Sequence, residues 1–141
     1  MSRGYRTWRW AAVCVYLVVI ALFTLTPRRG TSGAVTPNFA PLDSLIALFR
    51  WQTRRGVVTN ITGNLLLFAP LAVLLRVLIT RSATRVLIVV MAASVAVEAV
   101  QGLGWTDGRH ANVDDVLLNV AGAAIALGIR RLLRDPPFGS N

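Results

Sequence analysis

The sequence of 141 residues contains no lysine, one cysteine, one histidine and only six acidic residues. With one cysteine, Cys14, an intramolecular disulfide is excluded, and its apolar surroundings indicate a small packing residue. The absence of lysine suggests a GC-rich coding bias and a bacterial source. No glycine-rich phosphate loop, nucleophile elbow or zinc-protease helix motif is found.

Apolar residues, in contrast, are abundant. They make up 55% of the chain, and the mean hydropathy is +0.59. A soluble domain of this size leaves much of its surface in water and cannot bury so much apolar area. This composition predicts an integral membrane protein.

The net charge is +9, and all 15 basic residues are arginines. Most of them flank the apolar runs, where arginine anchors a helix at a membrane surface. No basic helix, aromatic platform or nucleic-acid-binding motif accompanies them, so we predict that the chain does not bind nucleic acid.

Four apolar runs have the length and composition of membrane spans, at about residues 8–26, 57–79, 86–103 and 113–133. A cleaved signal peptide is the alternative for the first run, because three arginines precede it. That run is long for a signal sequence, and Pro27-Arg28-Arg29 is a poor cleavage context, so we favour a retained helix. Within the second run, Pro70 removes a backbone hydrogen bond and predicts a kink.

The long polar interval after the first span contains apolar residues at helical spacing: Leu42, Leu45, Ile46 and Phe49. This pattern predicts a short amphipathic helix lying in the membrane interface, or packed on the bundle surface. The predicted fold is therefore an all-α polytopic membrane protein, one domain over residues 1–141. It has four transmembrane helices plus this short interfacial amphipathic helix in the first loop.

Arginine distribution predicts the orientation. With the N-terminus inside, cytoplasmic segments carry nine arginines and outer loops carry six. By the positive-inside rule, both termini lie in the cytoplasm of a bacterial plasma membrane.

Polar residues inside three spans follow helical spacing. They are Asn60 and Asn64 in the second span, Ser94, Glu98 and Gln101 in the third, and Asp115, Asn119 and Gly122 in the fourth. The third helix runs opposite to the other two, so all three polar patches are expected to meet at one membrane face. A charged group at bilayer depth is costly and needs a partner or a function.

The cluster has a structural and a functional interpretation. The amides can serve only as hydrogen bonds between helices, and Glu98 can be a paired structural acid. In the functional interpretation, Glu98 and Asp115 are catalytic or accepting groups, and Asn60, Asn64, Gln101, Arg109 and Asn119 bind ligand. Asp114 is expected to be the N-cap of the fourth helix. We predict no cofactor; a metal site that uses His110 with nearby carboxylates is a minor alternative.

These residues resemble the VanZ-like family of bacterial membrane proteins. The matching pieces are Asn38-Phe39-Ala40-Pro41, Asn60-x-x-Gly63-Asn64-x-x-x-Phe68-x-Pro70, Ser94-x-x-x-Glu98-x-x-Gln101, Arg109, and Asp115-x-x-x-Asn119-x-x-Gly122. The first-loop motif departs from the family pattern around Phe39 and Leu42, and Ala72 stands in the region where the family has a glycine. The resemblance implies a four-helix membrane protein, and the best-known family member is linked to low-level resistance to the glycopeptide teicoplanin.

We therefore expect a cell-envelope protein whose outer-face cluster engages a lipid-linked wall precursor, a phospholipid head group or a glycopeptide antibiotic. The alternatives are a membrane hydrolase or transferase that uses Glu98 as acid or base, and a small proton-coupled transporter. The expected partner is membrane lipid or a lipid-linked precursor, and assembly into a homo-oligomer is an open alternative.

Overall fold

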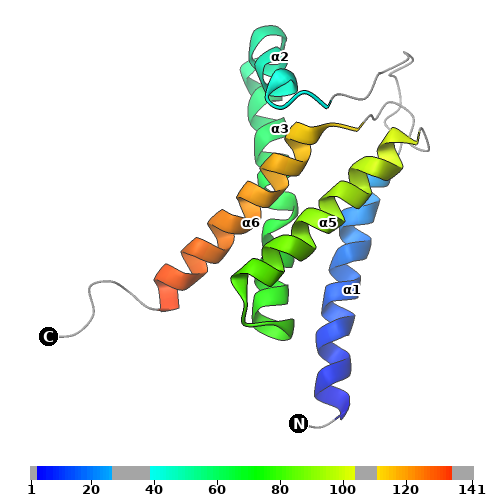
Figure 1. Ribbon diagram of the computed structural model, residues 1–141, viewed down its shortest axis with the longest axis vertical. Coiled ribbons are helices and arrows are strands. Elements are labelled where there is room, and N and C mark those ends of the chain that lie inside the picture. Colours follow the sequence, from blue (N-terminus) through cyan, green and yellow to red (C-terminus); the bar gives the residue numbers. More distant parts are fainter. Residues whose placement is uncertain (1–2, 27–38, 104–110, 135–141) are drawn as a thin grey trace, which may run out of the picture.

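The computed structural model describes residues 3–26, 39–103 and 111–134, and the described part is helical (Figure 1). The elements are α1 (Arg3–Leu25), α2 (Asp43–Trp51), α3 (Arg54–Leu67), α4 (Ala69–Leu74), the π-helical turn η1 (Leu75–Ile79), α5 (Ala83–Gly102) and α6 (Val113–Arg134).

Four helical segments are long and apolar enough to cross a membrane. They are Thr7–Leu25, Arg54–Ile79, Ala83–Gly102 and Val113–Arg134. The second is built from α3, α4 and η1 in succession. The prediction of an all-α polytopic membrane protein with four spans is confirmed, although the second and third spans begin slightly earlier than predicted.

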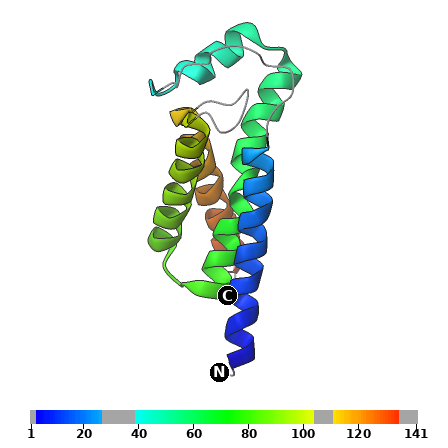
Figure 2. The ribbon, with the colours of Figure 1, turned by 90° about the vertical axis from the view of Figure 1, so that its right-hand side faces the viewer.

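Successive spans run in opposite directions, so the bundle has two distinct ends (Figures 1 and 2). Helix α6 packs against α3, α4 and α5, while α1 packs against α4, η1 and α5. Helix α2 lies across one end, opposite the end where α1 begins and α6 finishes. The end covered by α2 is called the α2 end below.

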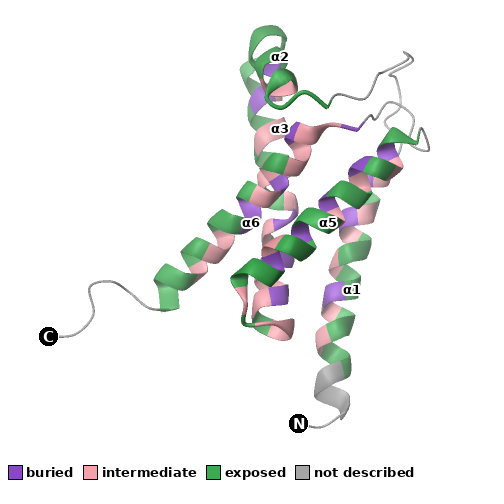
Figure 3. Ribbon diagram, in the orientation of Figure 1, coloured by how far each residue is buried: buried purple, intermediate pink, exposed green. Residues whose placement is uncertain are grey.

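The core is a narrow apolar seam between the spans. Phe68, Leu71, Val86, Val90 and Ala123 are buried there. Large apolar side chains cover much of the outer surface, and Figure 3 shows exposed residues along every span. In water such a surface would be unstable, whereas lipid tails solvate it.

The second span is interrupted where the sequence predicts. Helix α3 ends at Leu67, Phe68 is the junction residue, and Pro70 stands in the first turn of α4. Proline has no N–H and its ring clashes with the preceding turn, so the helix breaks just before it. The predicted kink is confirmed, whereas the π-helical turn at Leu75–Ile79 has no signal that we identified in the sequence.

Helix α2 combines both predicted placements of the amphipathic segment. Leu48 is buried, and α2 packs against α3 and α6. Leu42, Ile46 and Phe49 are exposed on its other side. The helix is thus docked on the bundle and still presents an apolar face outward, which is the arrangement of an interfacial helix.

Candidate ligand-binding cavity

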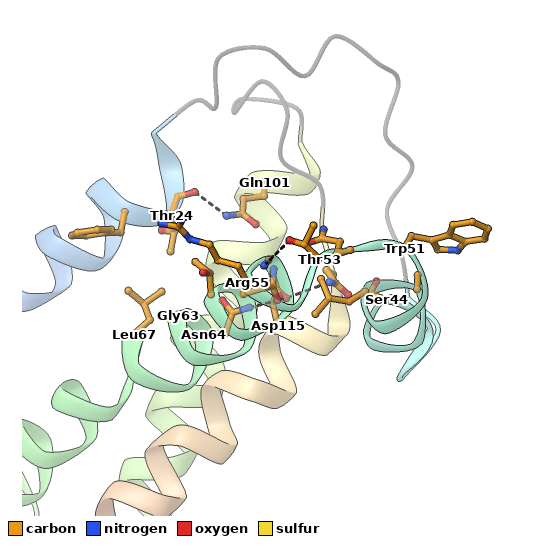
Figure 4. Close-up of a pocket in the computed structure, with 18 residues that line it drawn as sticks. Thr24, Ser44, Trp51, Thr53, Arg55, Gly63, Asn64, Leu67, Gln101 and Asp115 are labelled. Atoms are coloured by element: carbon orange, nitrogen blue, oxygen red, sulfur yellow. Dashed lines mark hydrogen bonds between the residues drawn. The ribbon is translucent and has the colours of Figure 1, made fainter.

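A cavity of about 840 Å³ lies at the α2 end of the bundle (Figure 4). Its walls come from the last turn of α1, from α2 and the turn after it, from one face of α3, from the end of α5 and from the start of α6. Half of the lining side chains carry hydroxyl or amide groups, and Arg55 and Asp115 are the charged members. The space is large enough for a small ligand or a head group.

Asp115 is held by two amide groups. Asn64 Nδ2 donates to Asp115 Oδ1 at 3.0 Å, and Asn112 Nδ2 donates to the same oxygen at 3.2 Å. The first bond joins α3 to α6 across the cavity wall (Figure 4). A carboxylate that accepts several hydrogen bonds is fixed in position and its charge is partly balanced.

Gln101 connects two other helices at the same end. It is buried, and its Nε2 donates to the backbone carbonyl of Thr24 at 2.8 Å. Carbonyls in the last turn of a helix have no partner within the helix, so this bond satisfies one of them. Gln101 thereby ties the end of α1 to α5 and forms part of the cavity wall.

Glu98 lies behind the cavity and does not line it. Its side chain is 7% exposed, and Oε2 accepts a hydrogen bond from the backbone N–H of Asn112 at 2.7 Å. Asn112 in turn accepts from the backbone N–H of Asp114 through Oδ1 at 3.1 Å. Glu98 therefore holds the residue that caps α6, and through it positions the start of that helix.

Asp114 has a different role from the N-cap that the sequence suggested. The cap of α6 is Asn112, because its side chain accepts the orphan N–H at the helix start. The Asp114 carboxylate accepts instead from the backbone N–H groups of Leu42 at 2.6 Å and Leu45 at 3.0 Å. Asp114 thus caps α2 from another helix, a contact that sequence spacing alone does not reveal.

The structure brings together four of the predicted site residues. Asn60, Asn64, Gln101 and Asp115 all line the cavity. Asn119 lies deeper, where Nδ2 donates to Ser94 Oγ at 2.8 Å, and its Oδ1 has no hydrogen-bond partner in the described chain. Arg109 and His110 lie outside the described residues, and the residues that are described contain no cluster of three metal-ligating side chains.

Arg55 is the cavity residue that sequence reasoning missed as a site residue. It follows the amphipathic segment and enters the sequence analysis only as one of the six outer-loop arginines. In the structure it lines the cavity (Figure 4). Its guanidinium forms no ion pair or hydrogen bond with another residue in the described ranges.

Among the cavity residues of α3, Arg55, Thr59, Gly63 and Leu67 follow one another four residues apart. Residues spaced four apart share a helix face, so counting back from Gly63 in steps of four leads to Thr59 and then to Arg55. Thr24, Ser44 and Trp51 also line the cavity. No pattern around those three residues distinguishes them in the sequence.

Searches of curated proteins and of solved structures gave no match. The profile of the VanZ/LLP1 family matches residues 12–134, which span all four membrane helices and every wall of the cavity. The chain is a multi-pass membrane protein that belongs to the VanZ/LLP1 family.

Proposed function

We propose that this protein binds the anionic head group of a cell-envelope molecule in the cavity at the α2 end. The observation that carries the proposal is Arg55, a guanidinium that lines a cavity rich in amides and hydroxyls and pairs with no other described residue. A planar guanidinium binds phosphate or carboxylate with two hydrogen bonds.

The other lining groups complement such a ligand. Asn60, Asn64 and Gln101 supply amides, and Thr59 and Ser44 supply hydroxyls. These groups both donate and accept hydrogen bonds, so they suit the hydroxyls of a sugar or of glycerol. The Asp115 carboxylate only accepts hydrogen bonds, so it favours a ligand that carries a hydrogen-bond donor next to its anionic group.

Membrane orientation sets the biological context. If the termini are cytoplasmic, as the arginine distribution predicts, the α2 end faces outward. There the cavity would meet lipid-linked wall precursors, phospholipid head groups and glycopeptide antibiotics. Family membership is consistent with a link to glycopeptide resistance, and we propose low-level teicoplanin resistance as the phenotype.

Binding fits the geometry better than catalysis by Glu98 does. A general acid or base must reach the reacting group directly or through one water. Glu98 is buried behind Asn112 and holds that residue's backbone N–H. A hydrolase or transferase and a proton-coupled carrier are therefore the alternatives to be tested, with Glu98→Gln as the discriminating variant.

The proposed test compares Arg55→Gln with the matched control Arg54→Gln. Both arginines are exposed in the first turn of α3, but only Arg55 lines the cavity. The purified chain is titrated in detergent with a fluorescent polyprenyl phosphate, with fluorescent phosphatidylglycerol and with teicoplanin. Loss of one charge-assisted contact of about 1.5–3 kcal/mol predicts roughly 10- to 100-fold weaker binding for Arg55→Gln.

Cells that express each variant are tested for teicoplanin susceptibility in parallel. We expect Arg55→Gln to lose the protection given by the wild type and Arg54→Gln to keep it. Equal affinities and equal susceptibility for the two variants would refute the proposed function.

A further inference from the structure

The cavity wall changes character along α3, from charged to apolar. Arg55 and Asn60 line it near the helix start, Gly63 and Asn64 follow, and Leu67 lies at its deep end. At a rise of about 1.5 Å per residue, Leu67 lies about 20 Å further along the helix than Arg54. Leu67 is in the middle of the second membrane span, Arg54–Ile79, so the deep end of the cavity lies beside a membrane-spanning segment.

The opposite wall at this depth belongs to α1. Phe23 and Thr24 line the cavity there, and Phe23 is 70% exposed. Both residues fall within the first membrane span. The cavity therefore reaches the space between two membrane spans, where the side chains of Phe23 and Leu67 give it apolar walls.

Helices α1 and α3 contact their neighbours more than they contact each other. α1 contacts α4, η1 and α5, and Figure 1 shows α1 and α3 apart at the α2 end. Tyr16 OH donates to the Leu67 carbonyl at 3.0 Å and joins the two helices below the cavity. From that bond toward the α2 end, the cavity occupies the space between them.

Gly63 leaves room in this wall. A Cβ built on it meets no atom within 4 Å, so the cavity is open at this point. Asn60 is one turn before Gly63 and Asn64 follows it directly, and both line the cavity. The backbone of Gly63 is therefore accessible to a ligand chain at this point of the wall.

We infer that the ligand is a membrane lipid with a phosphate head group, and that it reaches the cavity sideways between α1 and α3. Resting on the proposed function, this inference assigns the phosphate to Arg55 and the first part of the tail to Gly63 and Leu67. The remainder of the tail stays in the bilayer. A water-soluble glycopeptide would use only the polar half of the cavity.

Photo-crosslinking in vesicles tests this inference. The full chain is reconstituted in phosphatidylcholine with a small fraction of probe, either phosphatidylglycerol or polyprenyl phosphate, bearing a diazirine near the start of the tail. Labelled peptides are mapped by mass spectrometry. We expect both the α1 segment with Phe23 and the α3 segment with Gly63 to be labelled above the general lipid-facing background.

The variant pair is Gly63→Leu and Gly128→Leu. Both glycines are helical and exposed, and a Cβ at either one meets nothing within 4 Å, but Gly128 is on α6 and does not line the cavity. In Gly63→Leu the leucine side chain occupies the tail site, so the lipid tail loses the burial of about two methylene groups there. Specific labelling should fall roughly tenfold. Gly128→Leu should leave it unchanged. Gly63→Ala adds only one carbon, so it should fold normally and give an intermediate decrease if the larger variant misfolds.

The crosslinking variants distinguish failure of this inference from failure of the proposed function. Specific labelling by either lipid probe supports sideways access, and the probe that labels more strongly identifies the class of lipid. If Gly63→Leu labels like Gly128→Leu and free glycerol 3-phosphate competes fully with both probes, sideways access is wrong while head-group binding stands. If Arg55→Gln labels like Arg54→Gln, the proposed function itself is wrong.

Discussion

Asp114 holds helix α2 through the backbone of Leu42 and Leu45, 72 and 69 residues earlier in the chain. Its carboxylate is 1% exposed and accepts both N–H groups, at 2.6 and 3.0 Å. Leu42 itself adopts a left-handed conformation with φ 68°, which a leucine rarely takes and which must be stabilised by its surroundings. The docking of α2 therefore depends on one buried carboxylate of α6.

Removing this carboxylate should release α2. In Asp114→Asn the charge-assisted hydrogen bonds to two N–H groups are weakened. We expect the docking of α2 on the bundle to be about 2 kcal/mol less favourable, which corresponds to a roughly thirtyfold larger undocked fraction. Trypsin cleavage after Arg50, within α2, should accelerate accordingly. Asp43→Asn is the control, since Asp43 is exposed in the first turn of the same helix. Equal cleavage rates for the two variants would show that Asp114 does not hold α2.

Gly122 allows α6 to lie close against the backbone of α3. A methyl group in its place would lie 2.6 Å from the carbonyl carbon and 2.8 Å from the Cα of Leu65, both on the α3 backbone. Backbone cannot move aside as a flexible side chain can, so Gly122→Ala should destabilise the fold by about 1–3 kcal/mol. Unfolding in a denaturing detergent, followed by circular dichroism, measures this loss.

Gly128→Ala is the matched substitution on the same helix, with open space around the added carbon. Alanine has the higher helix propensity by about 1 kcal/mol, so this variant should be neutral or slightly more stable. Similar unfolding curves for the two alanine variants would contradict the close approach of α6 and α3.

Glu98 is expected to act by positioning Asn112. In Glu98→Gln the side-chain oxygen can still accept the Asn112 N–H, so the start of α6 and most ligand affinity should be retained, with a loss of about 1–2 kcal/mol in stability. Glu98→Leu offers no acceptor and should lower both stability and binding. Complete loss of function in a well-folded Glu98→Gln protein would instead support the acid–base or proton-carrier alternatives. Uptake into liposomes at several pH values then distinguishes those two.

Orientation can be measured because Cys14 is the sole cysteine. In a Cys14→Ser background, Thr53→Cys places a thiol between α2 and α3 at the cavity end, and Thr84→Cys places one in the first turn of α5 at the other end. A membrane-impermeant maleimide should label Thr53→Cys on intact cells and Thr84→Cys only after lysis. The reverse pattern would place the cavity on the cytoplasmic face.

The sequence predicted the fold because lipid imposes strong constraints on composition. Long apolar runs flanked by arginine gave the four spans, and Pro70 gave the break between α3 and α4. The meeting of Asn64 with Asp115 followed from helix direction and depth alone, and the structure confirms that contact. Whether these residues bind ligand remains a prediction.

The features that the sequence did not predict depend on tertiary contacts, which leave no local pattern in the sequence. Asp114 looked like a cap for its own helix, yet it caps α2. Arg55 counted only as an outer-loop arginine, and the packing of α2 beside α3 makes it part of the cavity wall. The partner of Gln101 is a backbone carbonyl, which no residue type in the sequence can indicate.

Native mass spectrometry tests the central claim most directly, because it weighs the ligand that stays bound when the protein leaves the detergent. Wild type, Arg54→Gln and Arg55→Gln are each equilibrated with the same polyprenyl phosphate and phosphatidylglycerol, and the bound fraction is compared. We expect one phosphate lipid retained on the wild type and on Arg54→Gln, and little or none on Arg55→Gln. Equal retention by all three proteins would contradict a phosphate site at Arg55.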